Sequence, residues 1–235
     1  MTAAPGAGPQ LPLNIRPRDD ATLDNFLFTP AVAPLKPMLE GQSGAAGEPI
    51  IYLHGPAGAG KSHLLQASCH ATAGGSLYLP LAELLAYPPE SVLAGVESLD
   101  LVCIDDLQAT QGRADWEQAL FHCFNRARAR GCRLLVSADR APRALDMVLE
   151  DLRSRLSWGI VYHLPGLDDA QRVRLLTFRA GRRGLRMGED VASYLVSRAP
   201  RDPTSLLNLL DILDQRALAE KRALTVPFVK QVMGW

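Results

Sequence analysis

The 235-residue sequence contains few lysines and carries no net charge. Only four of its 25 basic residues are Lys and 21 are Arg, and 25 acidic residues balance them. Proteins that hold DNA by bulk charge are usually strongly basic, so this balance argues against such a protein. No apolar run approaches the roughly 18 residues of a membrane-spanning helix. The N-terminus, rich in Ala, Gly and Pro, lacks the basic start and apolar block of a secretory signal. We therefore expect neither a membrane anchor nor a signal peptide.

Cysteine and histidine are also scarce and show no metal-ligand spacing. The four cysteines, which form no CxxC pair, are Cys69, Cys103, Cys123 and Cys132, and the five histidines are scattered. Cys69 and Cys103 lie in apolar periodic stretches and are expected to be buried thiols. This pattern predicts a reduced, cytoplasmic protein without disulfides or structural zinc.

Hydrophobic residues make up 47% of the chain, and many gather in short runs that are typical of buried strands. The runs span 50–54, 76–80, 101–105, 133–138 and 159–164. Helical patterns lie between most of them, notably at 61–72 and 115–130, and further ones follow at 168–183, 188–198, 203–223 and 227–233. Buried strands that alternate with helices predict an α/β fold with a parallel sheet covered on both faces. The later helices predict a small all-α domain.

The predicted organisation has three parts. Residues 1–20 carry four prolines and no periodic pattern, and are expected to form a flexible tail. The α/β domain is expected over 21–165 and the helical domain over 166–235.

A phosphate-binding pattern follows the first apolar run. The segment Gly-Pro-Ala-Gly-Ala-Gly-Lys-Ser matches G-x-x-x-x-G-K-[ST], with an apolar strand before it and an amphipathic helix after it. Gly55, Gly58 and Gly60 let the loop turn its N–H groups toward phosphates, and the helix start adds its positive end. Lys61 is expected to reach the β- and γ-phosphates, and Ser62 is expected to hold Mg²⁺. The sequence therefore predicts a nucleotide-binding domain.

Two carboxylates, Asp105 and Asp106, end the third apolar run. A buried strand ends in two carboxylates only when they are solvated or bind something. Asp105 comes some forty residues after the phosphate loop, where it is placed to orient Mg²⁺ and its waters. Asp106 is placed to polarise an attacking water, although Asp is one methylene shorter than the Glu common there. A solvated strand end is the alternative.

Two downstream segments resemble the AAA+ module of the bacterial replication initiator DnaA. They are LLVSADRAP over 134–142 and LEDLRSRLSWG over 149–159. From about Leu23 to the C-terminus the chain is similar to the DnaA/Hda family. The resemblance implies an AAA+ P-loop NTPase fold with a five-stranded parallel sheet between helices, a helical lid domain, and ADP or ATP with Mg²⁺ as cofactors. The regulatory branch of the family is favoured over the initiator, because we expect neither its helix-turn-helix domain nor its long N-terminal domains.

The tail sequence QLPLNI resembles the hexapeptide QLxLx[L/I] that binds the sliding clamp. Gln10 has donors and acceptors, and Leu11, Leu13 and Ile15 alternate along an extended peptide. Such a peptide could place apolar side chains in a pocket while its main chain bonds a sheet edge. A random tail is the alternative, because six-residue patterns recur by chance. The resemblance implies that these residues bind the DNA polymerase sliding clamp, its beta subunit, and that the chain reaches DNA only through the clamp.

Arg155 matches the arginine finger of the family, within its SR(L/F)xWG segment. Such a finger enters the nucleotide site of a neighbouring protein, where a forked, always charged guanidinium stabilises phosphoryl transfer. The alternative is an internal salt bridge with Asp151, Glu150 or another acid. Arg153 is interpreted as a supporting or surface group.

Two more family positions are identified, and one departs from the pattern. Asp139 matches the sensor-1 region, with Ser137 as a secondary candidate. Thr204 aligns with the sensor-2 arginine of the lid, but Thr cannot reach or neutralise a γ-phosphate. Arg201 or Arg198 would lie one or two turns away and point in another direction. This departure favours a weakly catalytic module that holds a diphosphate.

Two arginine clusters have plain explanations. Arg126, Arg128, Arg130 and Arg133 close a predicted helix, where cations suit the helix dipole. Arg172, Arg179, Arg183 and Arg186 share one face of the first lid helix, for which a solvated face is the default and contact with DNA or a partner the alternative.

These patterns predict a regulatory AAA+ protein with weak or absent ATPase activity of its own. It would be tethered to the clamp, and so associated with the nucleoid, and would present Arg155 to ATP-bound DnaA. Hydrolysis there would inactivate DnaA and prevent re-initiation of DNA replication. Self-assembly, as a homodimer or in the AAA+ manner, stays open. The main alternative is a self-sufficient AAA+ ATPase such as a helicase loader. A small-molecule kinase or a purely DNA-binding module fits the motifs less well.

Overall fold

The computed structural model describes residues 18–41 and 48–235, and a five-stranded parallel sheet lies at its centre. The strands are β1 (Ile50–His54), β2 (Ser76–Pro80), β3 (Leu101–Asp105), β4 (Arg133–Ala138) and β5 (Ile160–His163), in the order β2-β3-β4-β1-β5. Ile50 of β1 pairs with Leu134 of β4, and Ile51 pairs with Ile160 of β5. The predicted α/β fold is confirmed, and four of the five strands have the predicted bounds.

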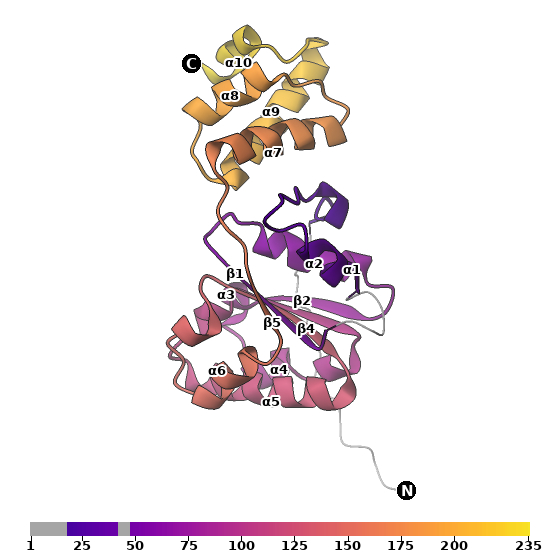
Figure 1. The fold of residues 1–235 in the computed structure, drawn as a ribbon, viewed down its shortest axis with the longest axis vertical. Coiled ribbons are helices and arrows are strands. Elements are labelled where there is room, and N and C mark those ends of the chain that lie inside the picture. Colours follow the sequence, from indigo (N-terminus) through magenta and orange to yellow (C-terminus); the bar gives the residue numbers. More distant parts are fainter. Residues whose placement is uncertain (1–17, 42–47) are drawn as a thin grey trace, which may run out of the picture.

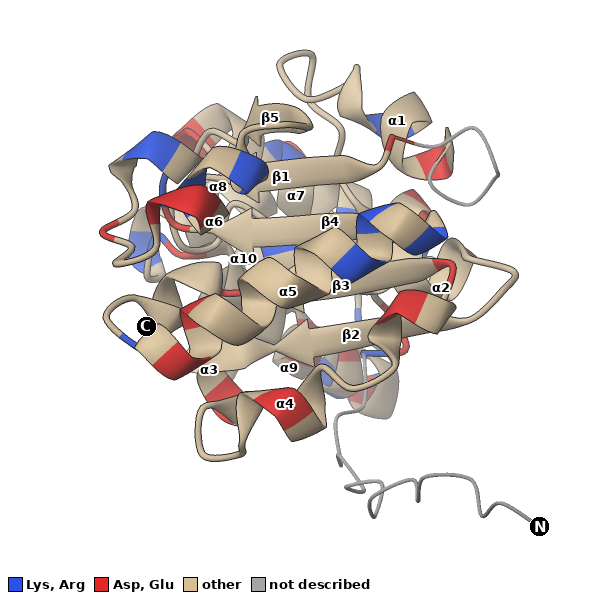
Figure 2. Ribbon diagram, turned by 90° about the horizontal axis from the view of Figure 1, so that it is seen from below, with Lys and Arg blue, Asp and Glu red and all other residues tan. Residues whose placement is uncertain are grey.

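Helices cover both faces of the sheet (Figure 1). One face carries α1 (Leu35–Gly41), α2 (Lys61–Ala71) and the 3₁₀ turn η1 (Leu23–Asn25). The other carries α4 (Pro89–Val92), α5 (Ala114–Arg130) and α6 (Glu150–Leu156), and Figure 2 looks onto α5 where it crosses the strands. The short elements α3 (Leu81–Leu84), η2 (Val96–Ser98), η3 (Leu107–Thr110) and η4 (Pro142–Ala144) lie in the connections.

Alternate residues of each strand point to opposite faces and so enter two separate cores. On the α2 side, Ile51 and Leu53 pack with Leu64 and Leu65. On the α5 side, the alternate strand residues pack with Trp116 and other large apolar side chains. All four cysteines are buried thiols, which confirms the prediction for Cys69 and Cys103.

Four helices after the sheet form a lid with a core of its own. They are α7 (Asp169–Arg182), α8 (Glu189–Arg198), α9 (Pro203–Glu220) and α10 (Val226–Met233). Leu195, Leu210 and Phe228 are fully buried within this core. The lid stands beyond α1 and α2, away from α5 (Figure 1). In the part of the chain described, no helix is both long enough and apolar enough to cross a membrane.

Side-chain caps mark the starts of α7 and α9 in the lid. Asp168 forms a reciprocal capping box with Gln171 at the start of α7. Asp202 caps α9, with Pro203 in the first turn. The predicted extension of this helix to residue 223 is wrong, because Lys221 adopts a left-handed conformation (φ +51°) that ends α9 at Glu220.

Candidate nucleotide-binding site

The loop between β1 and α2 wraps the positive end of α2. Gly60 precedes the helix in a left-handed conformation and supplies no side-chain cap, so the first N–H groups of α2 are left for an anion. Gly58 is also left-handed, with φ +76°. A Cβ at Gly58 would approach Cδ of Pro203 in the lid to 2.7 Å, and one at Gly60 would approach Cε2 of Phe26 to 2.6 Å. Two other parts of the chain therefore pack directly on this loop.

Lys61 is the buried cation of the loop. Its Nζ donates to the backbone oxygens of Gly55 (2.7 Å) and Pro56 (2.9 Å). Burial lowers the pKa of Lys61, and the carboxylates of Asp106 and, more weakly, Asp105 oppose that shift. A phosphate that replaced the two carbonyl groups would pair with a cation that is already desolvated.

Asp105 is held firmly at the end of β3. Its carboxylate accepts hydrogen bonds from the hydroxyl groups of Tyr78 (2.6 Å) and Ser137, and it is 1% exposed. Burial and the neighbouring Asp105 raise the pKa of Tyr78, so this hydroxyl keeps its proton. The alternative interpretation, in which Asp105 is simply exposed to solvent at the end of the strand, is therefore wrong. Tyr78 was missed by sequence analysis, because it lies on β2 and meets Asp105 only through strand pairing.

Asp106 follows β3 and lines a cleft beside the phosphate loop. It adopts a left-handed conformation (φ +57°) that is uncommon outside glycine. Its backbone N–H donates to Ser137 Oγ (3.1 Å), and its carboxylate accepts from Gln108 Nε2 (2.9 Å). Ser137 thus binds both strand-end aspartates and holds the turn in this conformation.

A cleft of about 370 Å³ lies where the phosphate loop, the segment 18–27 and the lid meet, and this is within the usual size range of small-molecule sites. From the first two parts it is lined by Arg18, Asn25, Phe26, Leu27, Ala57, Gly58, Ala59, Gly60, Lys61, Ser62 and His63. Asp106 and the lid residues Leu167, Leu175, Arg179, Pro203, Thr204, Leu207 and Asn208 complete the lining. Thr204 thus faces the cleft, whereas Arg198 and Arg201 are not among the lining residues.

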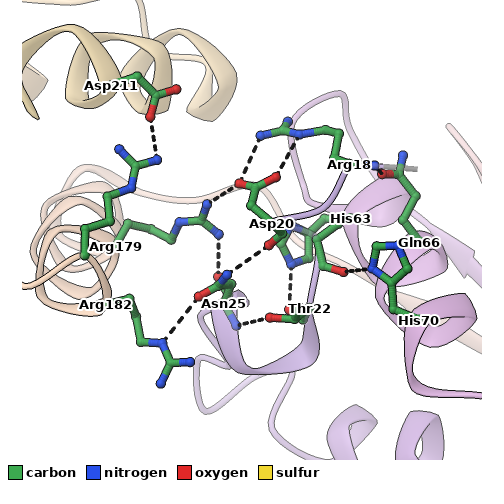
Figure 3. A network of polar contacts seen from close by, with 12 residues as sticks. Arg18, Asp20, Thr22, Asn25, His63, Gln66, His70, Arg179, Arg182 and Asp211 are labelled. Atoms are coloured by element: carbon green, nitrogen blue, oxygen red, sulfur yellow. Dashed lines mark hydrogen bonds and ion pairs between the residues drawn. The ribbon is translucent and has the colours of Figure 1, made fainter. Parts of the chain in front are cut away.

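Segment 18–25 joins the lid to α2 (Figure 3). On the lid side, Arg179 donates to the carboxylate of Asp20 (2.6 Å) and to the backbone oxygen of Asn25 (2.9 Å). Partial burial favours a higher pKa for Asp20, but hydrogen bonds from Arg179 and Arg18 outweigh it and lower the pKa.

On the α2 side, histidine rings bind the same segment through its backbone. His63 Nε2 lies 2.8 Å from the oxygen of Thr22, and His70 Nδ1 lies 2.9 Å from that of Ala21. Burial lowers the pKa of His63, and because a carbonyl oxygen only accepts, Nε2 is the donor in this bond. One wall of the cleft is therefore fixed to two parts of the fold at once.

The predicted solvated arginine face is wrong for Arg172, Arg179 and Arg183, and α7 ends at Arg182, so Arg183 and Arg186 lie beyond the helix. Arg179 is 4% exposed and pairs with Asp20. Arg172 pairs with Asp169, and Arg183 pairs with Asp211 at 2.5 Å. These partners lie close in space, but two of them are distant in sequence, which is why the pattern alone did not show them.

Arg179→Ala should weaken both the fold and the cleft. We expect a loss of about 1–2 kcal/mol in the free energy of unfolding, because a buried guanidinium leaves a partly exposed carboxylate behind. We also expect several-fold weaker ADP binding, because one wall loses its attachment to the lid. Urea denaturation and calorimetry measure the two effects. Arg174→Ala, at an exposed position of the same helix, is the matched control, and equal behaviour of the two variants would show that the attachment is unimportant.

Arg155 lies on α6, on the other side of the sheet from α2, and does not line the cleft of its own chain. Its guanidinium carbon lies 4.5 Å from the ring centre of Phe121 and 4.6 Å from that of Trp158. Among the described residues it makes no ion pair or hydrogen bond through its side chain, and its Nε is buried without a partner. The predicted alternative of an internal salt bridge is therefore wrong. Arg153 instead pairs with Glu150 (3.1 Å).

Glu117 orients the helix that carries Arg155, a role that sequence analysis missed. This carboxylate is fully buried on α5 and accepts from the backbone N–H groups of Gly112 (3.1 Å) and Leu149 (2.7 Å). Leu149 is the residue that precedes α6. The start of α6 is therefore tied directly to α5.

The remaining predicted residues lie in different places. Asp139 follows β4, and its carboxylate pairs with Arg140 (2.7 Å) outside the cleft lining.

Ser62 lines the cleft beside Lys61. No group of three or more His, Cys, Asp or Glu side chains in 18–41 and 48–235 could hold a metal ion by itself. Asp105 is not among the residues that line the cleft, so Ser62 and Asp105 suit Mg²⁺ only together with water and phosphate oxygens. The clamp-motif residues Gln10, Leu11, Leu13 and Ile15 lie outside the described residues.

Comparison with known proteins identifies the family. Residues 169–233 match the model of the Hda lid domain, and residues 90–163 match that of the bacterial DnaA ATPase domain. An uncharacterized protein of Haemophilus influenzae is 40% identical over 229 residues, which are 96% of this chain and 98% of that protein. The chain belongs to the DnaA/Hda family.

Solved structures agree with this assignment at the level of the fold. Domain III of DnaA from Thermotoga maritima is 20% identical, with a TM-score of 0.77 over 94% of this chain and 98% of that one. DnaA of Aquifex aeolicus bound to AMPPCP is 22% identical, with a TM-score of 0.72 over 84% of this chain and 66% of that one. The motor protein RuvB from Thermotoga maritima has a TM-score of 0.67 at 17% identity, over 91% of this chain and 71% of that one. The AAA+ fold with a C-terminal helical lid is thus shown, and the chain is an Hda-like DnaA homologue.

Proposed function

We propose that this chain is a regulatory member of the DnaA/Hda family that stimulates hydrolysis of the ATP bound to DnaA. One observation carries the proposal: among the described residues Arg155 makes no ion pair with an acid, and it lies on the opposite side of the sheet from the nucleotide cleft. A cation in that place cannot serve its own site. It is available to the phosphates of a neighbouring AAA+ protein, where it would offset the charge that develops during phosphoryl transfer.

The chain's own cleft would hold ADP or ATP. The loop N–H groups and Lys61 would bind the phosphates, while Ser62 and, through water, Asp105 would hold Mg²⁺. Bound Mg²⁺ would neutralise phosphate charge. Thr204 supplies no cation from the lid, and the Arg179 guanidinium, which does reach the cleft lining, already binds Asp20. This arrangement supports nucleotide retention with little turnover.

The rival proposal is a self-sufficient AAA+ ATPase, such as a helicase loader. The purified chain alone should hydrolyse ATP at a rate close to background, and hydrolysis should rise only when ATP-loaded DnaA is added together with clamp loaded on DNA. Steady turnover by the isolated chain, unchanged by DnaA, would favour the rival. Measuring ADP release with each protein alone and with both together, all in the presence of clamp loaded on DNA, separates the two.

Residues 10–15 would tether the chain to the sliding clamp. Replacing Gln10, Leu11 and Leu13 together with Ala should abolish binding to the clamp, because the hexapeptide loses its polar anchor and two apolar anchors. The melting temperature should stay the same, since a peptide that serves to bind the clamp has no structural role in its own chain. Surface plasmon resonance on immobilised clamp measures the first effect.

Asn14→Ala is the matched control for this triple variant, because it changes a variable position of the same motif. It should bind the clamp as the native chain does. Equal loss in both variants, or a large fall in melting temperature of the triple variant, would show that the segment has a structural role.

A further inference from the structure

The surface around Arg155 contains an exposed tryptophan, Trp158. Trp158 is 51% exposed, an unusual state for the largest apolar side chain. Its ring lies 4.6 Å from the guanidinium of Arg155 and 4.7 Å from that of Arg128. Two cations therefore share one indole at the surface of the α/β domain.

The backbone fixes Trp158 over Arg155. The turn after α6 closes with a hydrogen bond from the N–H of Trp158 to the oxygen of Arg155 (3.0 Å). The next residue, Gly159, passes so close to β1 that an added Cβ would lie 2.0 Å from the oxygen of Ile50. The chain at Trp158 therefore has little freedom to move away, and the indole is held where it meets the guanidinium.

Phe121 and Trp158 together confine the Arg155 side chain. Phe121 is partly buried and packs against the core beneath α5, so it forms a rigid support. Asp151 lies one helical turn before Arg155 on α6, a spacing that favours a salt bridge, yet the two make none. The guanidinium turns instead toward the aromatic rings.

Aromatic contacts suit a guanidinium that must act on another molecule. A carboxylate would hold Arg155 equally well, but it would cancel the charge, occupy the donors and repel incoming phosphate. A ring face attracts the cation without occupying its N–H donors. Arg128 adds a second positive charge beside the same ring, which makes the surface complementary to a polyphosphate.

We propose that Trp158 is a positioning residue for Arg155: its indole face holds the guanidinium ready to meet the phosphates of a nucleotide bound to a partner. This inference rests on the proposed function and adds a residue to it. It differs from a docking role, because a positioning residue affects the rate within the complex more than the affinity of the complex.

The test compares Trp158→Phe, which keeps an aromatic face, with Trp158→Leu, which keeps apolar bulk without one. Each variant is titrated into ATP-loaded DnaA with clamp and DNA, and the maximal stimulated rate is separated from the half-saturating concentration. Trp158→Leu should lower the maximal rate about tenfold, a change of about 1.4 kcal/mol. Trp158→Phe should stay within about threefold of the native rate. The half-saturating concentration should change less than about twofold in both.

Trp235→Leu is the matched control, because Trp235 is also exposed (40%) but lies against Tyr194 in the lid. It should behave as the native chain does. ADP binding and the thermal melt of every variant show whether it is folded. A native rate for Trp158→Leu would overturn the inference, as would equal losses for the Phe and Leu variants. A change confined to the half-saturating concentration would also overturn it and make Trp158 a docking contact.

Measuring Arg155→Ala in the same assay distinguishes failure of the positioning role of Trp158 from failure of the proposed function. If Arg155→Ala loses stimulation while Trp158→Leu retains it, only the positioning role fails. If Arg155→Ala itself stimulates normally, the proposed function fails, and the positioning role fails with it.

Discussion

Arg155→Ala should lower the stimulated hydrolysis of DnaA-bound ATP by about 10³–10⁵-fold, the range typical of arginine fingers. This corresponds to about 4–7 kcal/mol of transition-state stabilisation. Folding, ADP binding and clamp binding should be unchanged, because Arg155 makes no ion pair among the described residues and does not line the cleft. A hydrolysis assay and a thermal melt on one preparation measure both sides of the prediction.

Two further variants sharpen this test. Arg155→Lys should rescue poorly, since an ammonium keeps the charge but loses the forked geometry. Arg153→Ala is the matched control two residues away, where Arg153 pairs with Glu150 at the surface, and it should retain stimulation. Loss of activity in Arg153→Ala with none in Arg155→Ala would move the finger to Arg153.

Lys61→Ala should weaken ADP binding by at least about 100-fold, or about 3 kcal/mol, because the loop loses its buried cation. The variant should also be less stable, since the carbonyl groups of Gly55 and Pro56 lose their donor. Isothermal titration calorimetry measures the first effect. Lys36→Ala is the matched control, because Lys36 is half-exposed on α1 and makes only long contacts, to Glu40 (3.7 Å) and to the ring centre of Phe28 (5.9 Å). Native ADP affinity in Lys61→Ala would contradict the nucleotide site.

The parts of the fold that sequence could predict are those governed by local patterns. Strands of a parallel sheet are buried on both faces, so they appear as continuous apolar runs, and four of the five were placed at their observed bounds. The phosphate loop follows from its glycines and Lys61, which lie together in the chain. The short helices α1 and α4 were missed because each contains a proline and spans at most two turns.

The contacts that shape the site are long-range, and no local pattern contains them. Tyr78 reaches Asp105 because β2 pairs with β3, and Arg179 reaches Asp20 across 159 positions of the chain. The salt bridge considered for Arg155 was wrong for the same reason: Phe121 on α5 comes next to it only through helix packing. The sequence therefore indicated the candidate functional residues, whereas only the structure shows which side chains contact them.

A single-turnover reconstitution tests the central claim most directly. DnaA carrying labelled ATP is mixed with clamp loaded on DNA and with this chain, and conversion of the DnaA-bound label to ADP is followed over time. The account predicts rapid conversion that needs both the clamp and the native Arg155, and that slows when residues 10–15 carry the triple Ala change. Conversion no faster than with DnaA alone, or equal conversion with Arg155→Ala, would contradict it.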